Sequence, residues 1–192
     1  MIKERSWDIL IIGGSSGSGK STIAYELGHF YELNVVKVDD IKQGIKALTT
    51  LETLPMLHHW STGADWREIG VLGNVEWLIH VSEEISPALY AVIQYIHIDD
   101  AEPCILEGDF IHPAFGASFD NERVKSVFIQ EPDVDQIEAN IFKREGTHQA
   151  YRAEISCAHG NWLAKTCLTY GVPVVAPRLW DTLLKRVIDV LG

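Results

Sequence analysis

Gly13-Gly-Ser-Ser-Gly-Ser-Gly-Lys-Ser-Thr22 is the stretch that decides the fold of this chain. Residues 14–21 match the pattern G-x-x-x-x-G-K-[ST] at every fixed position, which is the signature of a phosphate-binding loop. The run before it, Trp7-Asp-Ile-Leu-Ile-Ile12, is short, apolar and rich in isoleucine, as expected of a buried strand. Apolar residues then recur at helical spacing as far as Tyr31. A strand, a glycine-rich loop and a helix are the context that the motif requires, whereas a flexible Gly/Ser turn that merely ends in Lys-Ser would lack both flanks.

This loop predicts a site for ATP and Mg²⁺. Glycines let the backbone curl so that successive N–H groups point at an anion, and the following helix N-terminus adds partial positive charge. Lys20 is expected to reach the β- and γ-phosphates and to be catalytic, and the Ser21 hydroxyl is expected to bind Mg²⁺. The nucleotide-binding residues predicted from the motif are Gly14, Ser15, Gly17, Ser18, Gly19, Lys20, Ser21 and Thr22.

The composition is that of an ordinary soluble domain. The 192 residues are 46% hydrophobic and 22% charged, which suits one domain with a sizeable core. The net charge of −11 argues against non-specific binding to nucleic acid or to an anionic membrane. Residues 1–6 lack a signal-peptide apolar region, no run of apolar residues is long enough to span a membrane, and the three cysteines have no Cys-x-x-Cys spacing. We therefore expect a cytoplasmic protein, either a monomer or a homodimer.

Apolar runs alternate with helical patterns along the rest of the chain. Five runs read as strands: 7–12, 33–38, 103–108, 124–130 and 172–176. The alternation predicts an α/β protein with a five-stranded parallel sheet covered on both faces, the three-layer arrangement of P-loop NTPases. We expect residues 1–192 to form one such domain.

The connection between the second and third expected strands is unusually long, at about sixty residues where short links are the rule. Its middle is mostly helical, so residues 41–102 are predicted to form an inserted substrate-binding lobe over the phosphate site. Trp66 to Val81 and Ile85 to Ile98 read as two helices within it, the second beginning with Ser86 as its N-cap and Pro87 at its first position.

Two carboxylates, Asp39 and Asp40, follow the second expected strand. Ligands of open parallel sheets bind outside the carboxyl ends of the strands. Asp39 is therefore predicted to be catalytic, orienting or deprotonating an acceptor hydroxyl, and Asp40 to be the N-cap of the next helix. The reverse assignment stays open from the sequence alone.

The third expected strand also ends on a carboxylate, in Glu107-Gly-Asp109. Glu107 stands where a Walker-B acid would hold Mg²⁺ directly or through water. Asp109 is interpreted as a solvated loop acid.

Three cations, Lys143, Arg144 and Arg152, bracket a predicted break at Gly146. In so acidic a chain, this spacing favours a lid over residues 143–152 in which Arg144 stabilises charge on a transferring phosphoryl group. Solvated helix ends explain the same spacing equally well.

Taken together, the P-loop, Val38-Asp-Asp-Ile41 and Ile105-Leu-Glu-Gly108 resemble P-loop kinases of small molecules, including nucleoside-monophosphate, shikimate and gluconate kinases. Leu57-His-His-Trp-Ser-Thr62 and Cys104-Ile-Leu-Glu-Gly-Asp-Phe-Ile-His-Pro113 resemble segments of the 2-phosphoglycerate kinase family, although His112 falls later than in that family's pattern. The resemblance implies that a lid arginine binds phosphate and that the loop after the fifth strand meets adenine.

Carried over to this chain, the resemblance assigns the phosphate contact to Arg144, with Arg152 as a second candidate, and the adenine contact to Ala176-Pro-Arg178. It also predicts an ATP-dependent phosphotransferase acting on a small-molecule acceptor. Two other functions stay open: a nucleoside or nucleotide kinase, with Lys42, Lys46 and Arg67 as candidate phosphate ligands, and a non-kinase regulatory ATPase. A GTPase is disfavoured, because the chain has no Asn-Lys-x-Asp motif.

Overall fold

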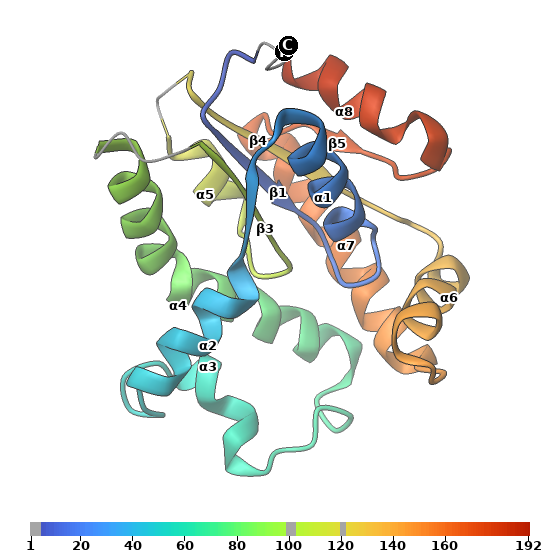
Figure 1. Ribbon diagram of the computed structural model, residues 1–192. Helices are drawn as coiled ribbons and strands as arrows, with labels where there is room; N and C mark the ends of the chain where they lie inside the picture. Colours follow the sequence, from blue (N-terminus) through green and yellow to red (C-terminus); the bar gives the residue numbers. More distant parts are fainter. Residues whose placement is uncertain (1–4, 99–102, 120–121) are drawn as a thin grey trace.

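In the computed structural model, which describes residues 5–98, 103–119 and 122–192, parallel strands form a single five-stranded sheet (Figure 1). The order across the sheet is β2-β3-β1-β4-β5, and every neighbouring pair is parallel. The strands are β1 (Ile9–Gly13), β2 (Asn34–Lys37), β3 (Cys104–Gly108), β4 (Val124–Ile129) and β5 (Val174–Val175). The predicted five-stranded parallel α/β fold is confirmed.

Helices connect these strands and cover them. They are α1 (Lys20–Tyr31), α2 (Val38–Leu48), α3 (Pro55–His58), α4 (Gly70–Ile98), α5 (Pro113–Ala117), α6 (Val134–Glu145), α7 (Ala150–Tyr170) and α8 (Leu183–Leu191), with 3₁₀ turns η1 (His59–Thr62) and η2 (Trp180–Thr182). None of the described helices combines the length and the apolar character that crossing a bilayer requires.

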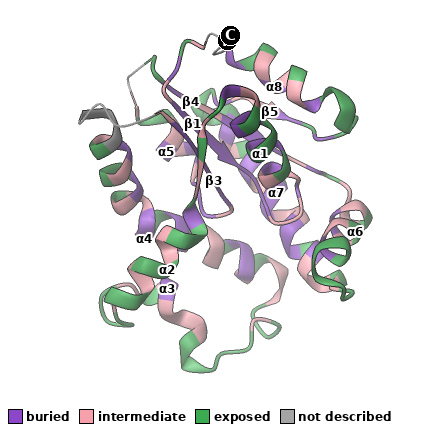
Figure 2. Cartoon of the chain, viewed as in Figure 1, coloured by how far each residue is buried: buried purple, intermediate pink, exposed green. Residues whose placement is uncertain are grey.

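Successive residues of β1 face opposite layers, as the pleat of a strand dictates. Ile9 and Ile11 pack on the side of α4, α5 and α7, whereas Leu10 and Ile12 pack on the side of α1 and α8. All residues of β1 and β3 are buried (Figure 2). A sheet buried on both faces explains why these strands are continuous apolar runs instead of alternating ones.

The register of the central strands sets their carboxyl ends level. Gly13 pairs with Gly108 and Ile12 with Glu107, while Lys37 at the end of β2 also pairs with Glu107. The P-loop after β1, the acid at the end of β3 and the residues after β2 therefore meet at one edge of the sheet.

Helix α4 corrects one sequence expectation. The predicted pair of helices is a single helix of 29 residues with Pro87 inside it, and Ser86 is not an N-cap, because its hydroxyl donates to the Ser82 carbonyl at 2.6 Å. The buried stripe Val81, Ile85 and Leu89 continues across the proline, and Pro87 itself is exposed, so water can reach the carbonyl that lacks a helical donor. Tertiary packing thus overrides the local signal, and α4 changes direction along its length (Figure 1).

Segments α2, α3, η1 and the first part of α4 lie beyond the carboxyl edge of the sheet (Figure 1). They occupy the position of the predicted lobe, of which residues 99–102 lie outside the described part. Figure 2 shows how much less buried they are than the sheet; Val38 is the one buried residue of α2, and η1 has none. That 41–102 binds substrate and that 143–152 closes as a lid remain predictions.

Candidate active site

The P-loop curls tightly between β1 and α1, and its glycines are needed where the backbone turns left-handed. Gly17 and Gly19 have φ angles of 77° and 93°, which residues with a side chain rarely adopt. A Cβ on Gly19 would also overlap the ring of Trp180. The hydroxyls of Ser15 and Ser18 are buried and have no hydrogen-bonding partner among the described residues. Unpaired buried donors in a loop that opens a helix suit an anionic ligand.

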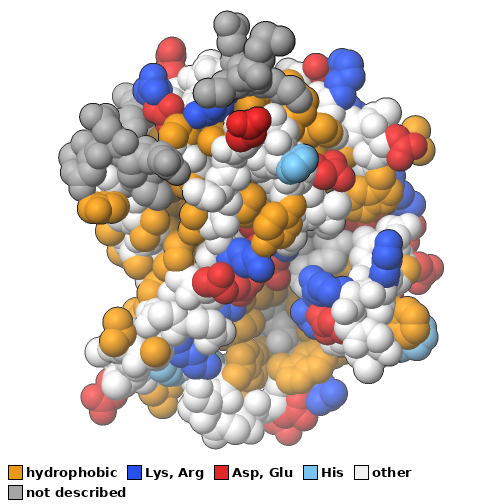
Figure 3. Space-filling model, in the orientation of Figure 1, with side chains coloured by type: hydrophobic (Ala, Val, Ile, Leu, Met, Phe, Trp, Pro, Cys, Tyr) orange, Lys and Arg blue, Asp and Glu red, His pale blue; other side chains and the backbone are white. Residues whose placement is uncertain are grey.

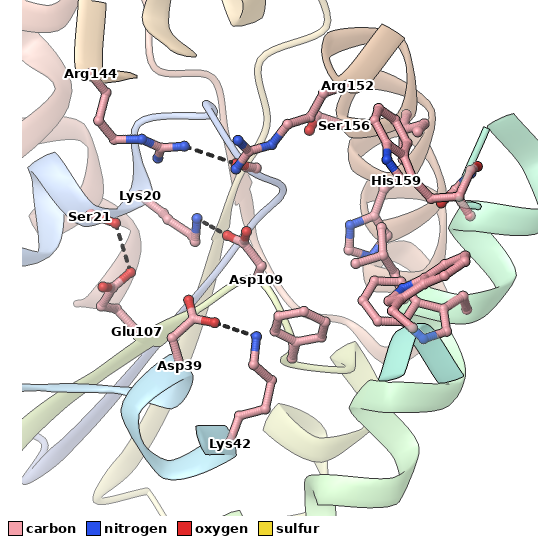
Figure 4. A pocket seen from close by; sticks show the side chains of 18 of the residues that line it. Lys20, Ser21, Asp39, Lys42, Glu107, Asp109, Arg144, Arg152, Ser156 and His159 are labelled. Carbon is pink, nitrogen blue, oxygen red and sulfur yellow. Dashed lines mark hydrogen bonds and ion pairs between the residues drawn. The ribbon is translucent and has the colours of Figure 1, made fainter. Parts of the chain in front are cut away.

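Lys20 begins α1 and is 5% exposed. Its ammonium forms an ion pair with Asp109 and donates to the Ser15 carbonyl at 3.4 Å (Figure 4). Burial alone would raise the pKa of Asp109, but the charge of Lys20 outweighs it and holds that pKa below its usual range. The interpretation of Asp109 as a solvated loop acid is therefore wrong: the register that sets β1 level with β3 puts it against the P-loop lysine.

Ser21 and Glu107 meet as the metal hypothesis requires. The Ser21 hydroxyl donates to Glu107 Oε2 at 3.0 Å, and the Glu107 side chain is buried. Burial raises the pKa of Glu107, partly offset by the nearby charge of Lys20. A hydroxyl and a carboxylate are hard oxygen donors of the type that Mg²⁺ prefers, and Mg²⁺ at a nucleotide site needs few protein ligands. The pair thus fits a magnesium ion, although the described residues contain no cluster of three or more His, Cys, Asp or Glu side chains that could hold a metal by themselves.

Two arginines from different helices converge on the P-loop. Arg144, near the end of α6, and Arg152, in the first turns of α7, place guanidinium nitrogens 3.4 and 3.3 Å from the Ser16 hydroxyl. Glu145 lies between them and accepts from Arg144 at 2.7 Å and from Arg152 at 2.8 Å. The pKa of Glu145 lies below its usual range, chiefly because the Gln149 amide donates to its carboxylate at 2.7 Å, with the hydrogen bond from Arg144 and the charge of Arg152 adding to the effect. The structure therefore brings together two of the three cations that the spacing singled out, whereas Lys143 is exposed and does not line the cavity.

Asp39 lies in the first turn of α2 and lines a cavity that Lys20 and Glu107 also line. Its carboxylate pairs with Lys42 at 2.6 Å, and the Lys42 ammonium lies 3.7 Å from the centroid of the Phe110 ring. The N-cap interpretation of Asp40 is wrong, because α2 begins at Val38 and its N-cap residue is Lys37. Asp40 is exposed within the first turn, where a negative charge still favours the helix dipole.

Arg178 does not line the cavity. Its guanidinium pairs with the buried Glu131 at 2.8 Å and with Asp133, the N-cap of α6, at 3.3 Å. The neighbouring ring of Trp180 packs against the P-loop at Gly19. Thr22, also predicted to bind nucleotide, is exposed on α1.

One cavity of about 720 Å³ joins these groups. Its polar end holds Ser16, Lys20, Ser21, Glu107, Asp109, Arg144 and Arg152, with Asp39 and Lys42 at its middle. The other end is lined by Trp60, Trp66, Trp77, Leu78 and Phe110. Figure 3 shows the molecule hollowed between the lobe and α6, with hydrophobic side chains inside the hollow.

His159 of α7 also lines the cavity (Figure 4), close enough to Asp109 and Lys20 for their charges to act on its imidazole. It is buried, and that burial lowers its pKa to about 4, so the imidazole is neutral at neutral pH. Two other histidines, His112 and His58, make hydrogen bonds that hold local structure. His112 accepts from the Ala114 N–H as the N-cap of α5, and His58 hydrogen-bonds Thr49 at 3.0 Å.

Sequence reasoning missed Asp109, His159 and the aromatic end of the cavity. A compositional signal was available for the last of these, because three of the six tryptophans fall within residues 60–77. No pattern in the sequence indicated that these rings would face the P-loop.

No protein-family model matches the chain. In sequence it resembles 2-phosphoglycerate kinases: the protein of Pyrococcus furiosus is 26% identical over 178 residues, which cover 87% of this chain and 58% of the relative. The protein of Pyrococcus horikoshii is 24% identical over 196 residues, covering 95% of this chain and 64% of the relative. The chain thus spans about three fifths of the length of these curated relatives.

Solved structures share its fold at low sequence identity. Shikimate kinase from Acinetobacter baumannii in complex with shikimate superposes with a TM-score of 0.55 at 10% identity, covering 97% of this chain and 94% of that one. Deoxyadenosine kinase from M. mycoides with bound dATP gives a TM-score of 0.53 at 12% identity, covering 95% and 98%. The chain therefore has the fold of P-loop small-molecule kinases and resembles 2-phosphoglycerate kinases in sequence.

Proposed function

We propose that this protein is a kinase that transfers the γ-phosphoryl group of ATP to a hydroxyl of a small molecule. The observation that carries the proposal is the single cavity in which the P-loop lysine, the Ser21–Glu107 pair, two arginines and Asp39 all have side chains. Phosphoryl transfer depends mainly on positioning and charge stabilisation, and this arrangement offers both. The sequence relatives, named as kinases of 2-phosphoglycerate, support the reaction class.

Each polar side chain then has a role. The P-loop N–H groups and the unpaired hydroxyls of Ser15 and Ser18 surround the phosphates, and Lys20 leaves Asp109 to contact them. Arg144 and Arg152, which already lie beside Ser16, neutralise charge on the transferring group.

Ser21 and Glu107 would hold Mg²⁺, which supplies positive charge that shields the phosphate oxygens during transfer. Binding of adenine near Ala176-Pro-Arg178 stays part of the proposal. It would place the base beside Trp180, whose ring already packs on the P-loop.

Asp39 orients the acceptor hydroxyl and takes its proton. It projects into the cavity from the first turn of α2, while the phosphate-binding residues lie at the ends of β1 and β3 (Figure 4). Its ion pair with Lys42 fixes the carboxylate in place, and the cavity leaves space around it for an acceptor.

The test is ADP formation from ATP and Mg²⁺ by the purified chain, with metabolites added one at a time. A kinase shows low turnover alone and a large increase with its acceptor. A regulatory ATPase, the competing function, would be stimulated by a protein partner and by no small molecule, and that result would overturn the proposal.

A further inference from the structure

Aromatic rings from four separate segments line the end of the cavity away from the P-loop, and three of these rings pack on one another. Trp60 comes from η1, Trp77 from α4, and Phe110 from the loop after β3. The Trp60 and Trp77 rings lie 5.3 Å apart at 61°, and the Trp77 and Phe110 rings lie 6.0 Å apart at 87°. Edge-to-face packing of this kind is favourable and fixes the angles between the rings.

Hydrogen bonds fix this wall in place. The Trp77 Nε1–H donates to the Met56 carbonyl at 2.8 Å, and the Glu84 carboxylate of α4 accepts from the N–H groups of Met56 and Leu57 at 3.0 and 2.9 Å. These bonds tie α3, and η1 directly after it, to α4. The aromatic chamber, defined here by Trp60, Trp66, Trp77, Leu78 and Phe110, is thus preformed.

Trp66 is positioned independently. Asn74 of α4 donates both amide protons, to the Trp66 carbonyl at 2.6 Å and to the Gly70 carbonyl at 2.8 Å, which anchors the loop before α4. The Trp66 ring also packs at 5.2 Å on Tyr151 of α7.

The charges around the chamber do not suit an anion. The Lys42 ammonium lies over the Phe110 ring, and Asp39 already neutralises it. Lys46 and Arg67, the phosphate ligands suggested by the sequence, do not line the cavity; Arg67 pairs with Asp65 and stacks over Trp66. A compound such as 2-phosphoglycerate carries a phosphate and a carboxylate. In this part of the cavity it would meet the carboxylates of Asp39 and Asp109 and the apolar rings, and the lysines beside those carboxylates, Lys42 and Lys20, are already paired with them.

The same features suit a flat, uncharged base carried on a sugar. Base–aromatic stacking is favourable and tolerates different bases. The carboxylates of Asp39 and Asp109 can accept hydrogen bonds from sugar hydroxyls, and the neutral polar side chains of Ser156 and His159 line the same cavity.

We propose that the phosphoryl acceptor is a nucleoside, bound with its base in the aromatic chamber and a sugar hydroxyl beside Asp39. This inference rests on the proposed kinase function. The sugar hydroxyl oxygen bonds to the γ-phosphorus while the bond from that phosphorus to the β–γ bridging oxygen breaks. The hydroxyl proton passes to the Asp39 carboxylate, and ADP leaves with the bridging oxygen and its electron pair.

Matched acceptors test the charge argument. Adenosine, guanosine, cytidine and uridine are compared with their 5′-monophosphates and with 2-phosphoglycerate by ADP formation in the presence of ATP and Mg²⁺. At least one nucleoside should raise ADP formation tenfold or more, with a kcat/KM at least tenfold above that of its monophosphate. Preference for a monophosphate or for 2-phosphoglycerate would overturn the inference and leave the kinase function standing.

Trp60 variants test the stacking argument. Tryptophan fluorescence is titrated with the preferred nucleoside, or with each of the four if none is turned over, in the presence of a non-hydrolysable ATP analogue. Trp60→Leu should raise the Kd for the nucleoside about tenfold or more, whereas Trp60→Phe, which keeps a ring, should change it less than threefold. The Kd for the ATP analogue should not change in either variant. If circular dichroism shows that Trp60→Leu is unfolded, Trp66→Leu serves in its place.

The two proposals fail in different ways. Absence of nucleoside binding in the fluorescence titration, or equal binding by the Leu variant, overturns the nucleoside inference. Saturable nucleoside binding that depends on Trp60, with no ADP formed from any acceptor, would support the aromatic chamber as a nucleoside-binding site and overturn the kinase function.

Discussion

The two ends of the cavity are built in different ways. The phosphate end is centred on one continuous stretch, residues 13–22, between a fully buried strand and a core helix, and Glu107, Asp109, Arg144 and Arg152 complete it. The aromatic end gathers rings from η1, the next loop, α4 and the loop after β3. Of these segments, η1 has no buried residue, whereas Phe110 in the loop after β3 is buried. A local motif thus builds the phosphate end, whereas the aromatic end depends on the tertiary arrangement of a less buried lobe. Segments with few buried contacts also open most easily, which suits a region that must admit a substrate.

Lys20→Ala should have the largest effect, because it breaks the phosphate end at its centre. Removing one preorganised charge from a transferring phosphoryl group costs about 10²–10³-fold in kcat, and here nucleotide affinity should fall as well. Steady-state ADP formation and titration of an ATP analogue measure the two losses. Unchanged affinity and turnover would show that residues 14–21 are not the nucleotide site.

Asp39→Asn should lower kcat by about 10²-fold, the lower end of general-base effects, because positioning dominates this reaction. The ATP affinity should barely change. Asp40→Asn is the matched control: it lies one residue away, is exposed and does not line the cavity, so its kcat should stay within about twofold. Loss of kcat in the Asp40 variant alone would reverse the two assignments.

Arg144→Gln should lower kcat about tenfold, as expected for losing a charge-assisted hydrogen bond to phosphate, with Arg152 still present. Lys143→Gln is the control, because Lys143 is exposed and does not line the cavity. Hydrogen exchange over residues 143–152 tests the lid directly: an ATP analogue should slow exchange there. Equal exchange rates with and without the analogue would argue for solvated helix ends.

His159, a buried residue of the cavity wall, should give the smallest effect, seen in how the free energy of unfolding depends on pH. Its pKa is about 4 in the folded protein, below the usual 6.5, so the unfolded chain binds the proton more readily. The stability that its neutral form contributes is full above pH 6.5 and is lost as the pH falls toward 4. Between pH 7 and 6 the loss is about 0.5–1 kcal/mol.

His159→Asn should remove this part of the pH dependence, whatever it does to the stability itself. Urea unfolding at pH 7 and pH 6 measures the difference, with the exposed His29→Asn as the control. The same slope in His159→Asn and in the unsubstituted protein would mean that this imidazole is not held neutral by burial.

Local signals failed where packing or topology outweighed them. Ser86-Pro87 has the residues of a helix start, yet the buried stripe through Val81, Ile85 and Leu89 carries α4 across it. Asp40 has the residue type of an N-cap, but α2 begins at Val38, directly after β2 ends. In both cases the sequence predicted a helix correctly and misplaced its beginning, because where a helix begins depends on the contacts of its neighbours.

The sequence by itself determined the P-loop, the five parallel strands and the acids at the ends of β2 and β3, because these depend on short patterns with a direct physical meaning. Only the tertiary structure decided that Asp109 pairs with Lys20, since the level register of β1 and β3 brings them together. It likewise decided that Trp60, Trp66, Trp77 and Phe110 share one chamber. Rings on four separate segments carry no periodicity relative to one another, so their meeting depends on how the lobe packs over the edge of the sheet.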